Sequence, residues 1–215
     1  MSFDIVCFDC DSTLSKIEGI DELGRQSGLF DELAALTNAA MNGELALEDV
    51  YGKRLALIKP DKAQMDSLAD LYITKMVEGV EEVFSALLAQ GKQVHIISGG
   101  IRQAILPLAE KLGIPADQVH AVDVLFNADG SYRDFDRQSP LARTGGKAVI
   151  CKAIQKQGRS MAMIGDGKTD LEAKQAGATV IGFGGVMQRD IVVAQADIFV
   201  NENSLTAVLP HLISL

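Results

Sequence analysis

The sequence predicts an α/β protein with a doubly wound parallel sheet, a small helical insertion and a β-hairpin. Apolar runs typical of buried strands alternate with segments of helical periodicity from residue 79 onward. The connections between these segments are short, as in strand–helix–strand units. Between the first apolar run and this alternating part, residues 15–78 carry helical patterning alone.

The first element is an expected strand that ends in two acidic residues. Residues 3–8 read FDIVCF, a nearly continuous apolar run that is typical of a central parallel strand covered on both faces. Asp9 and Asp11 follow it, at the strand end where ligands bind in open α/β sheets. Two carboxylates this close raise each other's pKa unless a cation lies between them, and Mg²⁺ suits carboxylates and phosphate oxygens. The alternative is a polar turn in which an Asp caps the next helix.

Four helical segments are expected in the insertion at residues 15–78. Apolar residues recur at helical spacing, and Asn42-Gly43 and Pro60-Asp61 break the pattern. The insertion is smaller than most independent domains but large enough to lie over a crevice. Residues 1–14 and 79–215 are left to form the core. The four helical segments are residues 18–27, 29–41, 45–58 and 63–76.

The remaining elements follow in order along the chain. Residues 80–91 carry apolar residues at amphipathic spacing and end at a glycine, so a helix is expected there. Pro107 is expected to kink the helix at residues 101–112 or to mark a new start within it. The turn residues 127–130 favour a hairpin between two β-rich pieces within residues 119–135. The other expected strands are residues 93–97, 160–164, 179–183 and 197–200, and the other helices begin near residues 145 and 171 and end near residues 154 and 177.

Polar or glycine-rich segments follow three of the expected strands. Ser98-Gly99-Gly100 follows the second strand, and residues 165–170, which read GDGKTD, follow a later one. Lys147 lies at the start of a helix. Because the carboxyl ends of parallel strands share one edge of a sheet, we expect these residues to converge with Asp9 and Asp11.

The converging residues suit phosphoryl transfer. Asp166 would add a third carboxylate to a Mg²⁺ site, and Asp170 would ligate the ion directly or through water. Ser98 with two glycines offers a hydroxyl and open backbone N–H groups for a phosphate, and Lys147 supplies a point charge. Taken singly, each of these segments also has a purely structural interpretation as a helix cap, a turn or a solvated lysine.

The two acids at the first strand end would share the chemistry. Asp9 would attack phosphorus to give an aspartyl-phosphate. Asp11 would protonate the leaving alkoxide and then deprotonate the water that hydrolyses the intermediate.

Four motifs of the chain resemble those of the haloacid dehalogenase superfamily. They are DCDST at 9–13, ISGG at 97–100, GGK at 145–147 and GDGKTD at 165–170. The sequence is closer still to the phosphoserine phosphatase family, which it also resembles in EGIDELG at 18–24, KRLALIKP at 53–60, LGIPADQV at 112–119 and IGFGG at 181–185. The resemblance covers nearly the whole chain. It implies a Rossmann-like core, with residues 15–78 as a helical cap inserted after the first strand.

The resemblance also implies roles for individual residues. Asp9 would be nucleophile and metal ligand, and Asp11 would be the acid/base and would offer its backbone carbonyl to the metal. Glu18 would face the ammonium group of phosphoserine and Arg54 its carboxylate, which an arginine can bind bidentately, with Met41 nearby. The remaining implied residues are Asp166 and Asp170 at the metal, and Ser98, Gly99, Gly100, Lys147 and Thr169 at the phosphate.

Two positions depart from the family pattern. Leu47 stands where relatives carry an aromatic residue against the substrate, and Asn42 stands where a glycine is often found. Both departures are expected to affect the choice of substrate rather than the chemistry.

Composition narrows the classes of protein that the chain can belong to. The net charge is −9 and no basic stripe is visible, which argues against nucleic-acid binding. No apolar run approaches a membrane span, and the N-terminus lacks the pattern of a signal peptide, so we expect a cytoplasmic protein without membrane contacts. Cys7, Cys10 and Cys151 are too few for a disulfide framework, and the histidines do not complete a zinc site. A monomer and a homodimer are both compatible with the sequence.

The expected activity is Mg²⁺-dependent hydrolysis of O-phospho-L-serine to L-serine and phosphate, a reaction of serine biosynthesis. One alternative keeps the site but acts on another small phosphomonoester or passes the phosphoryl group to another alcohol. An alternative of a different class is a receiver-like signalling module that is phosphorylated on Asp.

Overall fold

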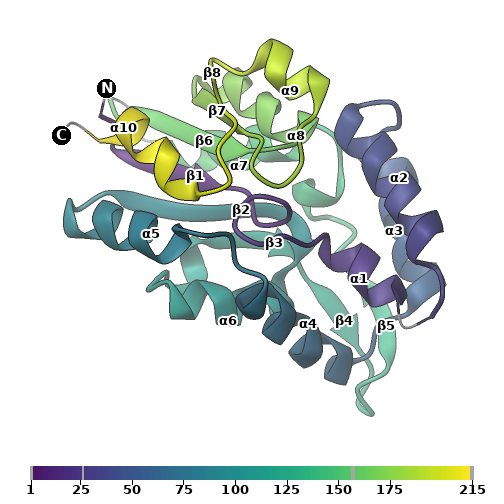
Figure 1. Cartoon of the computed structure of the whole chain (residues 1–215). Helices are drawn as coiled ribbons and strands as arrows, with labels where there is room; N and C mark the ends of the chain where they lie inside the picture. The colour runs from purple at the N-terminus through teal and green to yellow at the C-terminus, as the bar shows by residue number, and fades with distance from the viewer. Residues whose placement is uncertain (1, 26, 156–157, 214–215) are drawn as a thin grey trace.

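A computed structural model describes residues 2–25, 27–155 and 158–213 of the chain. Within these residues, six strands form one parallel sheet in the order β3-β2-β1-β6-β7-β8, and β4 and β5 form a separate antiparallel hairpin (Figure 1). The doubly wound α/β fold and the hairpin are therefore confirmed. The strands are β1 (Ile5–Phe8), β2 (Gln93–Ile101), β3 (Val119–Val122), β4 (Val124–Phe126), β5 (Tyr132–Phe135), β6 (Met161–Gly165), β7 (Thr179–Phe183) and β8 (Ile198–Val200).

The first strand lies in the middle of the sheet. Phe8 at its end is in register with Ile96 of β2 and Ile164 of β6. All residues of β1 and of β6 are buried, as expected for strands covered on both faces. The segments that follow β1, β2 and β6 are therefore brought to the same edge of the sheet.

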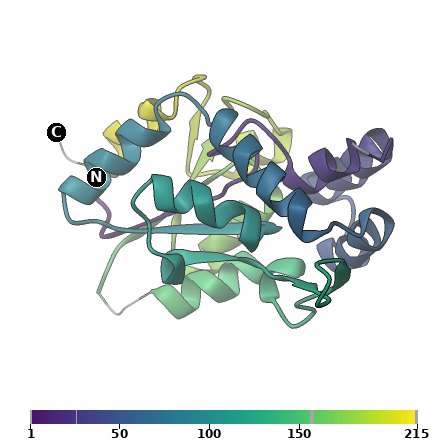
Figure 2. The same cartoon turned by 90° about the horizontal axis from the view of Figure 1, so that it is seen from below.

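Helices cover both faces of the sheet. In Figure 2, α5 and α10 lie above the strands and α7 lies below them. These helices bury apolar faces against the sheet, as Val83, Phe84 and Leu87 of α5 illustrate. The core helices are α5 (Val80–Ala89), α6 (Arg102–Lys111), α7 (Gly146–Ile154), α8 (Lys168–Leu171), α9 (Asp190–Gln195) and α10 (Leu209–Leu212), with short 3-10 turns at Ala116–Gln118, Pro140–Ala142, Glu172–Ala176 and Leu205–Val208.

The insertion after β1 contains four helices, of which the first three lie on the right in Figure 1 and the fourth lies nearer the middle, beside α6. They are α1 (Gly19–Arg25), α2 (Phe30–Asn42), α3 (Leu47–Ile58) and α4 (Lys62–Thr74). Each agrees with one of the four segments expected from the sequence, although Gln26 of the first segment lies outside the described residues. The hairpin packs against this insertion, because the rings of Tyr51 in α3 and Phe135 in β5 lie 5.2 Å apart.

Two local expectations were wrong, and one of the two alternatives for Pro107 was excluded. The second strand does not end at residue 97 but runs to Ile101, with a register shift against β3 after Ile97. The helix α6 continues through Pro107 without a new start. The segment after residue 170 is not one helix, since α8 gives way to a 3-10 turn at Glu172–Ala176.

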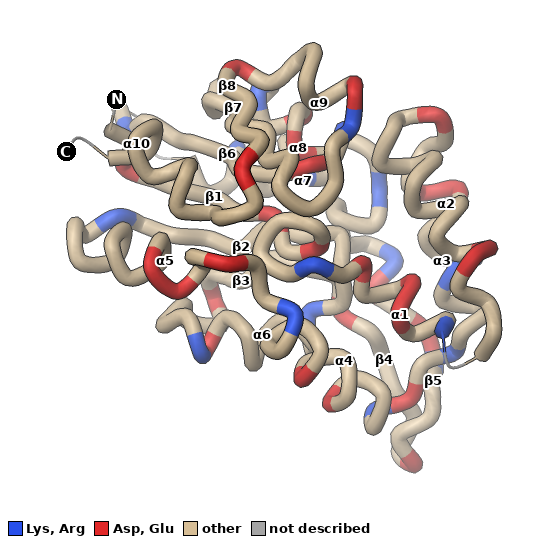
Figure 3. Tube along the Cα trace, viewed as in Figure 1, with Lys and Arg blue, Asp and Glu red and all other residues tan. Residues whose placement is uncertain are grey.

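Charged residues of both signs are spread along the trace (Figure 3). None of the described helices is long and apolar enough to cross a membrane. The cysteines Cys7, Cys10 and Cys151 are buried and free.

Candidate active site

Three carboxylates meet at the carboxyl edge of the sheet. Asp9 follows β1, whereas Asp166 and Asp170 belong to the segment after β6. All three are buried, and each offers an oxygen within 4.8 Å of the others. The structure thus brings together residues that lie more than 150 positions apart in the sequence, as the parallel sheet predicted.

Two cations accompany these carboxylates. Nζ of Lys147, in the first turn of α7, lies 2.8 Å from Oδ2 of Asp9 and 2.5 Å from Oδ1 of Asp170. Nε of Arg189 lies 3.2 Å from Oδ2 of Asp166. Burial opposes the charge of Lys147, but the carboxylates of Asp170 and Asp9 raise its pKa.

When all three carboxylates are ionised, the cluster keeps one excess negative charge, because they face two cations. Burial, and after it the charge of Asp9, raises the pKa of Asp166 to about 7. Buried hard oxygen ligands with an excess negative charge fit a divalent metal ion. Both oxygens of Asp170 have partners, because Oδ1 accepts from Lys147 and Oδ2 accepts from the backbone N–H of Gly167 at 2.9 Å. Asp9 likewise accepts from the Cys10 N–H at Oδ1 and pairs with Lys147 at Oδ2.

Asp11 points away from the three-carboxylate cluster. Its Oδ1 accepts hydrogen bonds from the Gly19 N–H and the Tyr72 hydroxyl, both at 2.7 Å, and its Oδ2 accepts from the Ser98 hydroxyl at 3.3 Å. Burial, followed by the charge of Asp9, raises the pKa of Asp11 to about 6. The side chain is therefore suited to exchange protons near neutral pH.

The glycine-rich end of β2 lies against Asp11. The hydroxyl of Ser98 accepts a hydrogen bond from the N–H of Gly100 at 2.9 Å. A Cβ at Gly100 would lie 2.6 Å from Oδ2 of Asp11, so only glycine fits at this position. Gly99 and Gly100 line the cavity together with Lys147.

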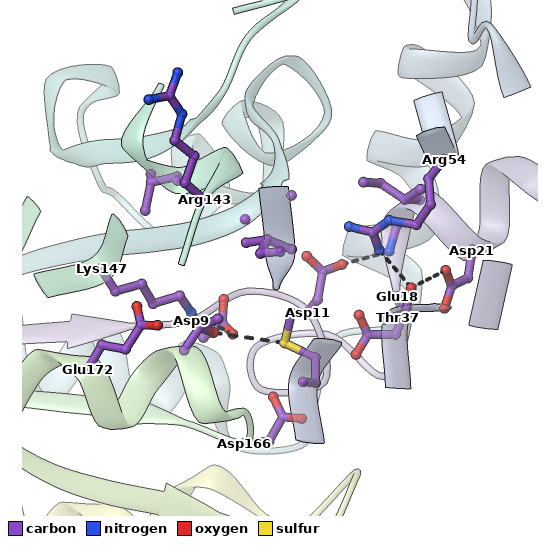
Figure 4. A pocket seen from close by; sticks show the side chains of 18 residues that line it. Asp9, Asp11, Glu18, Asp21, Thr37, Arg54, Arg143, Lys147, Asp166 and Glu172 are labelled. Atoms are coloured by element: carbon purple, nitrogen blue, oxygen red, sulfur yellow. Dashed lines mark hydrogen bonds and ion pairs between the residues drawn. The ribbon is translucent and has the colours of Figure 1, made fainter. Parts of the chain in front are cut away.

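One cavity connects the sheet edge with the helical insertion (Figure 4). The insertion contributes Glu18, Met41, Leu47 and Arg54 to its lining. Oε1 of Glu18 accepts from the Ser12 hydroxyl at 2.6 Å, and burial, followed by the charge of Asp11, raises the pKa of Glu18. The cavity is therefore lined both by the metal-ligand and phosphate-binding candidates of the sheet edge and by one acidic and one basic side chain of the insertion, Glu18 and Arg54.

The motif after β6 also contacts the insertion. Oγ1 of Thr169 lies 3.8 Å from Sδ of Met41, and both residues line the cavity. Asn42 does not line it, but its Oδ1 accepts from Nη1 of Arg189 at 3.3 Å.

Sequence reasoning missed several polar residues at the site. Arg189 lies just before α9 in a segment without a motif, so nothing in the local sequence points to it. Tyr72 bonds to Asp11, but it carries only the signal of a core residue in an amphipathic helix. Asp21 and Thr37 line the cavity beside Arg54, and of these only Asp21 lies in a stretch that the resemblance had marked.

Comparisons with known proteins agree with this geometry. A sequence model of the haloacid dehalogenase-like hydrolases matches residues 3–177. The chloroplastic phosphoserine phosphatase of Arabidopsis thaliana is 41% identical to this chain, and the match covers 91% of this chain and 68% of the relative. The phosphoserine phosphatase of Homo sapiens is 37% identical, and the match covers 94% of this chain and 90% of the relative. A solved structure of a phospho-aspartyl intermediate analogue of phosphoserine phosphatase has a TM-score of 0.85 and 27% identity, covering 99% of this chain and 100% of that one.

Proposed function

The chain belongs to the haloacid dehalogenase-like hydrolases, and from this premise we propose that it hydrolyses O-phospho-L-serine to L-serine and phosphate in the formation of serine. Relatives with the name phosphoserine phosphatase support this substrate. The observation that carries the proposal is a single cavity lined by Asp9 and Lys147 from the sheet edge and by Glu18 and Arg54 from the insertion. A zwitterionic phosphomonoester has a phosphate for the first pair and one charge of each sign for the second.

Asp9 is the proposed nucleophile. Its carboxylate attacks phosphorus, the P–O bond to the serine oxygen breaks, and the phosphoryl group becomes bound to Asp9 as an acyl phosphate. Lys147, which lies 2.8 Å from this carboxylate, is placed to balance the charge on the phosphoryl oxygens.

Asp11 is the proposed acid and base. It gives its proton to the leaving serine oxygen and then takes a proton from the water that attacks the phosphoryl group. Phosphate leaves and Asp9 is restored as a carboxylate. The pKa of about 6 allows Asp11 to hold and release a proton near neutral pH.

The metal is proposed to be Mg²⁺. Asp9 and Asp166, with the backbone carbonyl of Asp11, would hold it, and Asp170 would support the site through Lys147 and Gly167. When bound, the ion supplies positive charge to the phosphate oxygens and neutralises the carboxylates around them.

Residues 15–78 are proposed to act as the cap that closes this cavity. Ser98, Gly99, Gly100 and Thr169 would hold the phosphate, and Glu18, Met41 and Arg54 would hold the amino-acid part. Leu47, whose side chain lines the cavity, would pack against the substrate with an aliphatic surface.

The test is a panel of small phosphomonoesters assayed for phosphate release with Mg²⁺ and after metal removal by EDTA. We expect the highest kcat/KM for phosphoserine and loss of turnover without the metal. A preference for a substrate without an amino-acid group would contradict the assignment. Formation of a phosphorylated product from an added alcohol, in place of free phosphate, would instead identify a phosphotransferase.

A further inference from the structure

A buried chain of three polar side chains lies on the insertion side of the cavity. Asp21 comes from α1, Thr37 from α2 and Arg54 from α3, and their exposed fractions are 3%, 2% and 4%. Oγ1 of Thr37 lies 2.6 Å from Oδ1 of Asp21 and 2.7 Å from Nη1 of Arg54 (Figure 4). Three helices are thus joined at one hydroxyl group that lines the cavity.

The direction of each hydrogen bond in this chain is fixed by chemistry. A guanidinium group can only donate, so the Thr37 oxygen accepts from Arg54. The hydroxyl has a single proton, which it donates to the Asp21 carboxylate. Asp21 thereby orients the Thr37 lone pairs toward Arg54, and Thr37 holds the guanidinium in place.

The arrangement leaves the charge of Arg54 available to a ligand. Among the described residues, no carboxylate lies within ion-pair distance of its guanidinium. A direct Asp–Arg pair would compete with an incoming carboxylate, whereas the intervening Thr37 hydroxyl engages only one N–H. The guanidinium also lies 5.5 Å from the ring centre of Tyr51, which supports it without using a donor.

One donor of Arg54 has no hydrogen-bond partner among the residues that the structure describes. Its Nε is buried and makes no hydrogen bond. A buried, unsatisfied donor on a charged group is costly, so this atom points to an acceptor that a ligand would provide.

We propose that Thr37 and Asp21 are positioning residues that hold Arg54 for a substrate carboxylate, and that they set selectivity for phosphomonoesters that carry one. This inference rests on the proposed function. Arg54 touches the substrate carboxylate, and the other two residues act only through Arg54. Within the described part of the chain, the side chains of Thr37 and Asp21 form no hydrogen bond with Asp9, Asp11 or Lys147, so their effect is on substrate binding rather than on turnover.

The first test compares phosphoserine with O-phosphoethanolamine, which keeps the phosphate and the ammonium group but lacks the carboxylate. For Thr37→Val we expect KM for phosphoserine to rise about tenfold, as for the loss of a charge-assisted hydrogen bond, with kcat retained. Both constants for phosphoethanolamine are expected to stay unchanged. Thr37→Ser keeps the hydroxyl and should keep the wild-type ratio of the two substrates.

Two further variants separate positioning from general stability. Thr74→Val, at an exposed threonine of α4 that bonds only to the backbone carbonyls of Asp70 and Leu71, is the matched control and should behave as wild type. Asp21→Asn retains an oxygen that can accept from Thr37 but has no charge, so a smaller rise in the phosphoserine KM is expected.

The decisive measurement repeats Thr37→Val in an Arg54→Ala background. If Thr37 acts through Arg54, adding Thr37→Val to Arg54→Ala leaves the ratio of kcat/KM values for the two substrates as it is in Arg54→Ala alone. A further change in that ratio, or equal losses for both substrates in the single Thr37→Val variant, would overturn the inference. A wild-type enzyme that does not prefer phosphoserine over phosphoethanolamine would instead overturn the proposed function, and with it this inference.

Discussion

Two aspartates of the same loop differ in their surroundings. Asp9 is ion-paired with Lys147 at 2.8 Å and lies in the same buried cluster as Asp166. Asp11 is buried beside the charge of Asp9 and accepts hydrogen bonds only from neutral donors, so its pKa is raised to about 6. At the scale of single residues, environment alone therefore suits one carboxylate to nucleophilic attack and the other to proton transfer.

The simplest prediction concerns Asp9, the proposed nucleophile. Asp9→Asn keeps the size of the side chain but removes the attacking carboxylate, so phosphoserine turnover should fall by at least about 10³-fold. Steady-state phosphate release measures this loss, and circular dichroism checks that the fold is intact. Residual turnover close to wild type in a folded variant would exclude Asp9 as the nucleophile.

Tyr72 is hydrogen-bonded to Asp11, the proposed acid and base. Its hydroxyl donates to Oδ1 of Asp11 at 2.7 Å, and this bond lowers the pKa that burial raises. Tyr72→Phe should therefore raise the pKa of Asp11 by about 0.7 of a pH unit. Because the protonated form is the general acid, the fall of kcat/KM with rising pH should move to higher pH by the same amount.

The control for this shift is Tyr132→Phe in the hairpin strand β5, which leaves Asp11 untouched. A pH profile of Tyr72→Phe that coincides with wild type would show that the fall of kcat/KM with rising pH is not caused by titration of Asp11.

The sequence motifs predicted most residues of the candidate site, but not the polar residues that contact them from other helices and loops. Asp9, Asp166 and Lys147 could be placed together because each follows a strand end or starts a helix at one edge of a parallel sheet. Arg189 and Thr37 could not, because their contacts depend on how whole helices pack and leave no spacing signal in the sequence.

At the scale of elements, two helix ends join the insertion to the core. Helix α2 ends at Asn42 and is followed by Gly43 at φ 80°. Gly43 packs against the Lys168 side chain so closely that a Cβ there would lie 2.2 Å from it. At the N-terminus of α3, the Leu47 N–H donates to Oγ1 of Thr144 at 3.2 Å. Oε2 of Glu48 in turn accepts from the Thr144 N–H and hydroxyl at 2.9 and 2.8 Å.

The contact of Glu48 with Thr144 is expected to hold the proposed cap over the cavity. Glu48→Ala removes two hydrogen bonds across it, so KM should rise about threefold for phosphoserine and phosphoethanolamine alike. Asp49→Ala is the matched control, since this neighbouring acidic residue of the first turn of α3 is exposed. A Glu48→Ala effect confined to phosphoserine would contradict a role in docking, because docking does not distinguish the two substrates.

The positions of helices and strands along the chain were more predictable than the order of the strands within the sheet. Periodicity located the four helices of the insertion and the strands β6 to β8 because each buries one continuous apolar face or run. Strand order and the extension of β2 through Ser98-Gly99-Gly100 depend on contacts with β1 and β3, which are distant in sequence. Helix α6 runs through Pro107 without the new start that was one of two expectations, and its residues Ala104, Ile105 and Leu108 are buried in the core.

For the whole molecule, a chain of hydrogen bonds between β2 and β3 affects how stability depends on pH. Nη1 of Arg159 donates to Oε1 of Gln93 at 2.7 Å, which leaves the Gln93 amide N–H to donate to Nε2 of His95, also at 2.7 Å. Nδ1 of His95 therefore carries the proton and faces Nε2 of His120 at 3.1 Å. A second proton on His95 would oppose the Gln93 donor, so the folded state favours neutral His95.

Burial, followed by the proximity of His120, lowers the pKa of His95 to about 4, below its value of about 6.5 in an unfolded chain. Between these values the unfolded state binds a proton that the folded state does not, so the stability contributed by His95 is complete above about pH 6.5 and is lost as the pH falls toward 4. Asp11 and Asp166 act in the opposite direction, because their pKa values are raised in the folded state. The informative quantity is therefore the difference between wild type and His95→Gln.

We expect wild type to lose about 1–2 kcal/mol of unfolding free energy relative to His95→Gln between pH 7 and pH 5. Urea unfolding followed by circular dichroism at a series of pH values measures this difference, with EDTA present so that metal binding does not contribute. The carboxylates that titrate in both proteins cancel in the comparison. Parallel pH curves for the two proteins would mean that His95 titrates alike in the folded and unfolded states, because a group contributes to the slope only through a difference in bound protons.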